Sequence, residues 1–435
     1  MIKSRILILG AGLSGLSIAW HLNRMGVECR LFEKEGEVGG LCRSRNIRGF
    51  CFDYSGHLLH FNNRYAFDLI KSLLGNNLAE HQRSAWIYTY GRYIPYPFQA
   101  NLYKLPEKIK QECLSGLIRA SGGSRKKQKN NFLGWIEENF GQGIARNFLI
   151  PYNTKFWTIS PQDMTCEWLD GFIPVPSLSQ MLAGAVKASK DRFGYNAKFW
   201  YPKKGGIASL SNSLASSVKN IYTGCKVTGI DLARKEVKLS GSEKEKFDYL
   251  ISTIPLPEIP ALTGALPGRI SDSFSRLRWN SVFNLNLGID CKADKLKHWV
   301  YFPEKKIPFF RVGFFHNFSA YLAPQSKGSL YTEVSYPQGK EINDKMISRA
   351  KDALRKTGIL NNAKICIQDI NRIKYAYPIY DHNYALARSN ILQFLRQKNI
   401  FSCGRYGSWR YLSMQDVILE ARAAAKEVYG CLKKK

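Results

Sequence analysis

Three glycines near the N-terminus stand at the spacing that lets a backbone approach a phosphate group. Gly10, Gly12 and Gly15 form GxGxxG within RILILGAGLSGLSIAWHLNRMG. The apolar run at residues 5–9 predicts a buried strand, and residues 16–25 predict a helix that starts behind the turn. Such a turn brings backbone N–H groups and the positive end of a helix to a pyrophosphate. The stretch therefore predicts a dinucleotide-binding site.

An acidic residue and a second glycine element extend this motif. Residues 28–32 predict a second strand, and Glu33 follows it, 23 residues after the first glycine. A carboxylate at that spacing can accept hydrogen bonds from ribose hydroxyls. Gly39, Gly40 and Arg43 then follow in EGEVGGLCRS. This element is similar to the second glycine motif of FAD-binding flavoproteins of the amine-oxidase type, so we expect FAD as the dinucleotide.

The C-terminal stretch GRYGSWRYLSMQD, residues 404–416, combines cations, aromatic rings and a glycine turn. Arg405 lies between two glycines, which suits a site that holds an anion beside a flat ring better than it suits a surface loop. In amine-oxidase-type flavoproteins, a glycine turn and a helix near the C-terminus close over the flavin. The resemblance implies that Gly404 and Gln415 lie against the cofactor. It also implies that Val227, in GCKVTGI, belongs to a strand that returns to the cofactor domain.

Composition and length are typical of a multidomain globular protein. The chain has 435 residues, of which 45% are hydrophobic, enough for two or three domains with a substantial core. No apolar run approaches the ~20 residues of a membrane span, so we expect no transmembrane segment. The ten cysteines show neither CxxC nor Cys/His ligand spacing. That pattern predicts free thiols, no metal site and a cytoplasmic location.

The net charge of +30 would attract anionic molecules non-specifically. Its clearest run is GGSRKKQKNN at residues 122–131, whose flanking Gly and Asn indicate a solvated loop. Because no nucleic-acid-binding motif accompanies the charge, we expect no nucleic-acid partner. Peripheral association with an anionic membrane and homo-oligomer formation are both compatible with the sequence.

The pattern along the chain predicts an α/β fold in which a Rossmann-like FAD-binding domain carries a helical insertion and an antiparallel-sheet substrate domain. Residues 64–140 are mostly helical in pattern, and residues 280–340 alternate as strands. We expect the following segments: 1–63, first part of the FAD-binding domain; 64–195, mostly helical substrate domain; 196–275, FAD-binding return segment; 276–395, antiparallel-sheet substrate domain; 396–435, C-terminal part of the FAD-binding domain.

Several longer motifs resemble those of the UDP-galactopyranose mutase family, and the eukaryotic-type branch more than the common bacterial one. The resemblance runs nearly end to end. Its marks are SGHLLHF (55–61), PYPFQAN (95–101), PYNTKFW (151–157), NAKFWYPKKGG (196–206), HWVYFPEKKIPFFR (298–311) and GRYGSWRY (404–411).

The resemblance implies a flavoenzyme that catalyses an isomerisation without net redox change. In this family reduced FAD attacks the anomeric carbon of UDP-galactopyranose through N5, and the nucleoside diphosphate leaves. The sugar opens to an iminium and recloses as the furanose, UDP-galactofuranose, a precursor for cell-surface polysaccharide. The flavin is the nucleophile, in agreement with the absence of a recognisable triad in the sequence. NAD(P)H is a possible external reductant.

The resemblance also implies roles for individual residues. Those expected in catalysis, through the diphosphate and the flavin edge, are Arg311, Arg405 and His57. Those expected to bind FAD are Gly10, Gly12, Gly15, Glu33, Gly39, Gly40, Arg43, Val227, Gly404 and Gln415. Those expected to bind the nucleotide sugar are Tyr96, Gln99, Asn153, Trp157, Asn196, Trp299, Tyr301, Tyr377 and Tyr411.

Two positions depart from the family pattern. Phe172 stands where the family has a phosphate-binding arginine, and Phe318 replaces a tyrosine. Loss of one charge-assisted phosphate contact costs roughly 1.5–3 kcal/mol if nothing compensates. These departures leave open which sugar and which nucleotide bind. The Phe172 change also keeps open an FAD-dependent oxidase or desaturase of an apolar amine, carotenoid or porphyrinogen. The positive charge alone suggests a third reading, a flavin-bearing scaffold for a membrane-side glycan assembly complex, without turnover.

Overall fold

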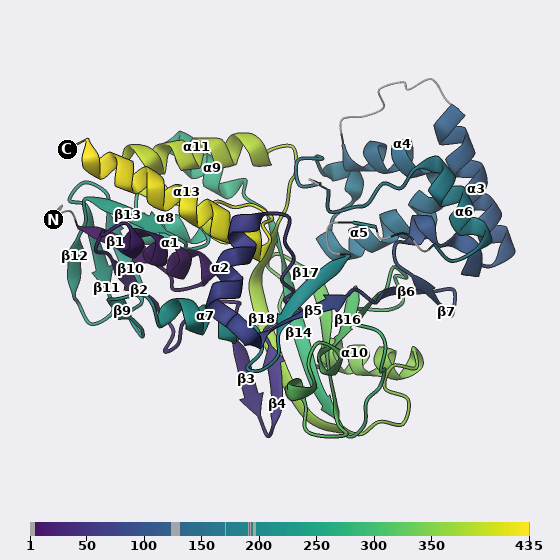
Figure 1. Cartoon of the computed structure of the whole chain (residues 1–435). Coiled ribbons are helices and arrows are strands. Elements are labelled where there is room, and N and C mark those ends of the chain that lie inside the picture. Colours follow the sequence, from purple (N-terminus) through teal and green to yellow (C-terminus); the bar gives the residue numbers. More distant parts are fainter. Residues whose placement is uncertain are drawn as a thin grey trace.

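The computed structural model describes residues 5–122, 131–169, 171–189, 191, 193–194 and 197–434. A five-stranded parallel sheet occupies one end of the molecule, where both termini also lie (Figure 1). In spatial order its strands are β19 (Ile400–Ser402), β13 (Tyr249–Ser252), β1 (Ile6–Leu9), β2 (Arg30–Phe32) and β9 (Ile221–Tyr222). Because these strands come from distant parts of the chain, the sheet closes only when the two ends of the sequence meet.

Helices and a small antiparallel sheet surround this parallel sheet. Helix α1 (Leu13–Arg24) packs against the C-terminal helix α13 (Met414–Lys433), and both bury apolar side chains with β1. The other helices of this part are α2 (Arg64–Leu74), α7 (Ala208–Ala215), α8 (Ile259–Thr263), α9 (Gly268–Ser275), α11 (Tyr384–Gln397) and α12 (Gly404–Gly407). The small sheet pairs β10 (Val227–Asp231), β11 (Glu236–Leu239) and β12 (Lys244–Lys246).

A seven-stranded mixed sheet forms the middle of the molecule. In spatial order it contains β18 (Ile365–Pro378), β14 (Trp279–Ile289), β17 (Gly328–Pro337), β16 (Arg311–Phe314), β15 (Trp299–Tyr301), β6 (Ala85–Thr89) and β7 (Arg92–Pro95). Only the β15–β6 pair is parallel. Helix α10 (Asp344–Lys356) covers one face. Strands β6 and β7 thus connect the segment 64–195, expected to be mostly helical, to the sheet of the next segment.

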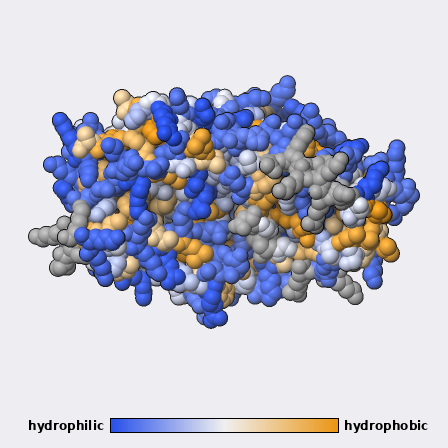
Figure 2. Space-filling view, turned by 90° about the horizontal axis from the view of Figure 1, so that it is seen from above, coloured by the Kyte–Doolittle hydropathy of each residue, from blue (hydrophilic) through white to orange (hydrophobic). Residues whose placement is uncertain are grey.

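A group of helices projects at the other end of the molecule (Figure 1). It contains α3 (Glu107–Gly122), α4 (Phe132–Ile144), α5 (Ile150–Trp157) and α6 (Leu178–Val186). Two antiparallel two-stranded sheets complete the fold: the hairpin of β3 (Ser44–Ile47) with β4 (Phe50–Asp53), and the long-range pair of β5 (Leu78–Gln82) with β8 (Lys198–Pro202). The surface seen in Figure 2 is mostly hydrophilic, with hydrophobic patches that include the end of the molecule carrying α3 and α6.

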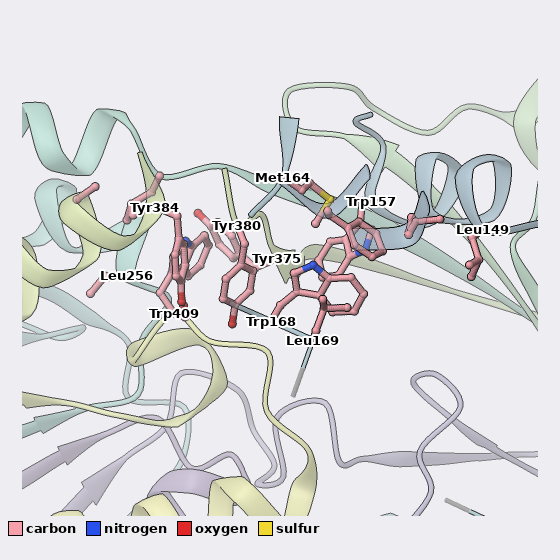
Figure 3. Close-up of a cluster of buried hydrophobic side chains, with 14 of the residues drawn as sticks. Leu149, Trp157, Met164, Trp168, Leu169, Leu256, Tyr375, Tyr380, Tyr384 and Trp409 are labelled. Atoms are coloured by element: carbon pink, nitrogen blue, oxygen red, sulfur yellow. The ribbon is translucent and has the colours of Figure 1, made fainter. Parts of the chain in front are cut away.

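Buried aromatic side chains join the helical group to the C-terminal turn (Figure 3). Trp157 and Trp168 meet edge to face at 4.8 Å between ring centroids. At the other end of this core, Tyr384 donates a 2.6 Å hydrogen bond to the Trp409 carbonyl, and Trp409 packs beside Tyr375. This core fixes the turn at residues 404–411 against the rest of the molecule.

The predicted fold class is confirmed: a Rossmann-like parallel sheet carries a helical insertion and an antiparallel-rich sheet. The segment boundaries stay predictions. All ten cysteines are free thiols. Among the described residues, no helix is long and apolar enough to cross a bilayer, and no group of His, Cys, Asp and Glu side chains has the arrangement of a metal site.

Candidate active site

A cavity of about 1080 Å³ runs from the glycine turn after β1 to the aromatic side chains of the helical group. Its walls include residues of the parallel sheet, the end of β18, the C-terminal turn and helix α5. One end is lined by backbone and small side chains, and the other by tyrosines, phenylalanines and tryptophans. The cavity therefore has an end suited to a dinucleotide and an end suited to a second, flatter ligand.

At the dinucleotide end, the glycines are required by geometry. Gly10 has φ +93°, and a Cβ there would overlap the Thr253 hydroxyl. A Cβ on Gly15 would overlap the carbonyl oxygen of Gly10, so this glycine lets α1 pack closely on the turn. A Cβ on Gly40 would lie 3.1 Å from the Gly12 Cα. The two glycine elements thus touch and form one backbone cradle.

The groups around this cradle suit a pyrophosphate and a ribose. The Ser14 hydroxyl at the start of α1 is buried without a partner among the described residues, and α1 has no side-chain cap on its first N–H groups. The buried Glu33 carboxylate accepts the Ala11 N–H at 2.7 Å and the Glu35 N–H at 3.0 Å. Both carboxylate oxygens are therefore oriented, and the side chain lines the cavity. A dinucleotide such as FAD fits this end.

All but one of the remaining residues expected to bind FAD lie at or directly behind the cavity wall. Gly39, Arg43, Val227 and Gly404 line the cavity, whereas Gly15 supports it from behind. Gln415 is not brought to the cavity. Its side-chain oxygen accepts the N–H groups of residues 62 and 63, both at 2.9 Å, and its nitrogen donates to the side chain of residue 62.

Arg405 lines the cavity and has no acidic partner among the described residues. Its guanidinium donates to the carbonyls of Leu412 and Ala376, both at 3.1 Å, and lies 4.8 Å from the ring centroids of Tyr377 and Tyr411. Its Nε is buried without an acceptor. No carboxylate lies within ion-pairing distance in the part of the chain that the structure describes. A cation held this way favours an anionic ligand.

Arg311, a second cation that lines the cavity, is already neutralised. Its side chain forms a two-pronged ion pair with Glu333, whose exposed fraction is 1%. The two residues face each other across β16 and β17. The Ser55 hydroxyl also donates to the Glu333 carboxylate. All three side chains line the cavity, so Arg311 is held in one fixed orientation beside the ligand space.

His57 lies between the two arginines and lines the same cavity. Burial and the nearby Arg405 lower the pKa of His57 to about 4, so the imidazole is neutral at physiological pH. The Ser55 carbonyl lies 3.2 Å from Nδ1 and accepts its proton. The neutral ring therefore presents Nε2 as an acceptor. It cannot act as a cationic contact to a phosphate.

The far end of the cavity is aromatic. Of the residues expected to bind substrate, those that line it are Tyr96, Gln99, Asn153, Trp299, Tyr301, Tyr377 and Tyr411. Burial raises the pKa of the Tyr377 and Tyr411 hydroxyls, so both remain protonated donors at neutral pH. Trp157 is fully buried behind this wall, against Tyr377 and Tyr411, and does not line the cavity. Asn196 lies outside the described residues.

The two departures from the family pattern occupy different places. Phe172 lines the cavity and packs on Tyr411 at 4.6 Å between ring centroids. It puts an apolar ring beside the Tyr411 side chain. Phe318 is a core residue with an exposed fraction of 2%, packed on Tyr201 and Phe199. It does not line the cavity, so its identity bears on packing rather than on the ligand.

Sequence reasoning missed three residues of this site. Glu333 and Ser55 hold Arg311, and Tyr152 forms part of the aromatic wall. The signal for Glu333 was an acid inside the strand pattern GSLYTEVSY, where an inward-facing carboxylate needs a partner. Tyr152 lies inside the motif PYNTKFW, directly before Asn153, which the resemblance assigns to substrate binding. Ser55 gave no signal that local sequence could supply.

Comparison with known proteins agrees with this architecture. Residues 13–429 match the family of flavin containing amine oxidoreductases. The crystal structure of reduced UDP-galactopyranose mutase is similar over 99% of this chain and 96% of that chain, with 28% identity and a TM-score of 0.93. Putrescine oxidase shares the fold, at 15% identity and a TM-score of 0.69 for one variant over 98% of this chain and 99% of that one.

Curated relatives lie further away in sequence. The 4,4'-diaponeurosporene oxygenase of Staphylococcus aureus is 22% identical over 333 residues, which cover 68% of this chain and 65% of that relative. The matched region thus spans less than two thirds of the relative's length. Because the family match extends over nearly the whole chain, this protein belongs to the family of flavin containing amine oxidoreductases.

Proposed function

We propose that the protein is a flavin-dependent mutase that interconverts the pyranose and furanose forms of a nucleotide sugar, with UDP-galactose as the first candidate. The observation that carries the proposal is Arg405, a cavity-lining cation with no acidic partner in the part of the chain that the structure describes. A nucleoside diphosphate supplies the missing negative charge. The similarity to UDP-galactopyranose mutase over nearly the whole of both chains supports the same activity.

The roles of the side chains follow from their positions. Arg405 would bind the diphosphate while it is separated from the sugar, because the guanidinium is held by carbonyls and rings and keeps its remaining N–H groups for a ligand. Tyr377 and Tyr411 would donate their hydroxyl protons to phosphate oxygens. Arg311 would contribute a cation whose orientation Glu333 fixes.

FAD fits the glycine cradle, and in its reduced form it supplies the nucleophile for the anomeric carbon. The chain's own contribution is then to bind, orient and retain the diphosphate. Neutral His57 adds a hydrogen-bond acceptor without adding a third cation. Activity of the reduced form, a cytoplasmic location and homo-oligomer formation belong to the same proposal.

The test is product analysis of the purified protein with UDP-galactose and a panel of other nucleotide sugars, with the flavin oxidised and again after dithionite reduction. We expect ring isomerisation in the reduced sample only. We also expect Arg311→Ala and Arg405→Ala to lose most turnover while they retain FAD. Equal conversion in both redox states, or no conversion of any sugar with intact flavin, would contradict the proposal.

A second candidate is an FAD-dependent oxidation of an apolar substrate. Phe172 and the aromatic end of the cavity favour it, as does the similarity to an enzyme named for oxygenation of a carotenoid. This reading leaves Arg405 without an anion. It predicts that the oxidised flavin is bleached by an apolar substrate under anaerobic conditions and that uridine diphosphate does not bind.

A further inference from the structure

One carboxylate holds both ends of the turn that carries Arg405. Glu420 lies on the second turn of α13. Its Oε2 accepts the Gly404 N–H at 2.6 Å and lies 3.3 Å from the Ser408 hydroxyl. Its Oε1 accepts a 2.5 Å hydrogen bond from the Arg410 guanidinium. A single side chain of α13 therefore contacts the residue directly before Arg405 and the next cation along the turn.

The ion pair within this turn determines which of its two arginines stays without an acidic partner. Glu420 pairs with Arg410, whereas the guanidinium of Arg405 donates to the carbonyls of Leu412 and Ala376. The exposed fractions of the paired side chains are 41% for the arginine and 17% for the acid. Because Arg410 neutralises the carboxylate, Glu420 can hold the turn without neutralising Arg405.

Helix α11 holds the middle of the same turn. The Arg388 Nε donates to the Ser408 carbonyl at 2.6 Å, and the Tyr384 hydroxyl donates to the Trp409 carbonyl at 2.6 Å (Figure 3). These bonds fix residues 408 and 409, and Glu420 holds the two ends on either side of them. Loss of Glu420 should therefore loosen the segment around residue 405 and leave the middle of the turn attached.

We propose that Glu420 is a positioning residue, which ties the ends of the turn to α13 and so presents Arg405 to the cavity as a cation without an acidic partner. The inference rests on the proposed function, because it takes a nucleoside diphosphate as the anion at Arg405. It adds a residue that contacts neither the diphosphate nor the sugar in that proposal.

Removal of Glu420 has two effects of opposite sign on ligand affinity. Loss of a negative charge near Arg405 would by itself attract an anion more strongly, so uridine diphosphate would bind more tightly. Loss of the contacts would leave the buried Gly404 N–H without this acceptor and would let the turn move, so the nucleotide would bind more weakly. The direction of the change therefore separates a positioning role from a purely electrostatic one.

The first test is isothermal titration of the full-length, FAD-loaded protein with uridine diphosphate. Glu420→Ala removes every acceptor and should bind about tenfold more weakly than the parent protein. Glu420→Gln keeps one oxygen for the Gly404 N–H and should recover part of this loss, to about threefold weaker binding. The matched control is Glu427→Gln on the same helix, where the carboxylate is 55% exposed and pairs with Arg396; it should bind like the parent.

The second test needs no nucleotide. Amide hydrogen exchange reports local opening of the backbone, and residues 402–411 should exchange faster in Glu420→Ala than in the parent protein or in Glu427→Gln. Faster exchange together with weaker nucleotide binding supports the proposal. If Glu420→Ala does not fold, Glu420→Gln carries both measurements, with the same signs expected.

Unchanged or tighter binding of uridine diphosphate by the Glu420 variant would overturn the positioning role, and so would exchange at the parental rate. A parent protein that binds no uridine diphosphate would instead contradict the mutase proposal. The exchange rates of residues 402–411 would then decide by themselves whether Glu420 holds the turn.

Discussion

The two arginines of the cavity lie in opposite electrostatic surroundings. Arg311 belongs to the wall of the antiparallel sheet and is paired with Glu333. Arg405 belongs to the C-terminal turn and is surrounded by tyrosine rings and carbonyls, without a carboxylate among the described residues. The first arginine is neutralised within the fold by its partner. The second leaves positive charge for a ligand to neutralise, so the ligand and not the fold satisfies it.

The largest effect should come from removing the paired cation. Arg311→Met leaves the buried Glu333 carboxylate without its ion pair, which should lower the free energy of unfolding by about 3–5 kcal/mol. Urea denaturation of the parent protein and of Arg311→Met at neutral pH measures this loss in the free energy of unfolding. The double variant Arg311→Met, Glu333→Leu removes both charges and should recover most of the loss. If single and double variants unfold at the same urea concentration, the loss does not come from an unpaired Glu333 carboxylate.

Removal of the unpaired cation should act on the ligand instead. Arg405→Met removes charge-assisted contacts and should weaken uridine diphosphate binding by about 1.5–3 kcal/mol, or roughly 10–150-fold, while stability stays equal or rises. Isothermal titration and urea denaturation on the same sample test both statements. Arg372→Met, at an exposed position on the cavity rim, is the control. If Arg405→Met lowers the free energy of unfolding as much as Arg311→Met does, the two arginines do not differ in their contribution to the fold.

A substitution at Gly404 can strain the turn that carries Arg405 and leave the charge of the arginine unchanged. Gly404 has φ +80°, and a Cβ there would lie 2.5 Å from the Ser14 hydroxyl. Gly404→Ala should therefore cost about 1–3 kcal/mol and lower both flavin occupancy and anion affinity. Absorbance at 450 nm against protein concentration gives the occupancy. Gly430→Ala, at an open position of α13, should leave flavin occupancy at the parental value.

The smallest effect concerns the neutral histidine between the arginines. The pKa of His57 is about 4 in the folded protein and near 6.5 in the unfolded chain. The unfolded state therefore binds more protons between these pH values, and His57 makes the protein less stable as pH falls from about 6.5 towards 4. In His57→Gln, melting temperature should fall less steeply over this window. His60 and His298, whose pKa values burial also lowers to about 4, should keep part of the slope. If melting temperature falls equally steeply with pH in the parent protein and in His57→Gln, the lowered pKa of His57 would be contradicted.

Local sequence was sufficient for the dinucleotide end of the site. The strand, glycine turn, helix and Glu33 follow one another within 33 residues, and each is specified by short-range chemistry: a turn needs glycine, a strand needs an apolar run, and a helix start attracts phosphate. Arg405 was also visible, because glycines on both sides isolate it. Gln415 shows the limit of this reasoning, since the loop at residues 62 and 63 takes its side chain.

Only the tertiary structure decided how the charges at the other end are balanced. Arg311 and Glu333 lie 22 positions apart, and they pair because β16 and β17 adopt one particular register. A shift of one residue would turn either side chain to the opposite face of the sheet. The packing of Phe172 on Tyr411, from segments more than 200 residues apart, depends on long-range contacts in the same way. Sequence determined which groups could bind a dinucleotide and an anion, whereas long-range packing determined which cation stays free for a ligand.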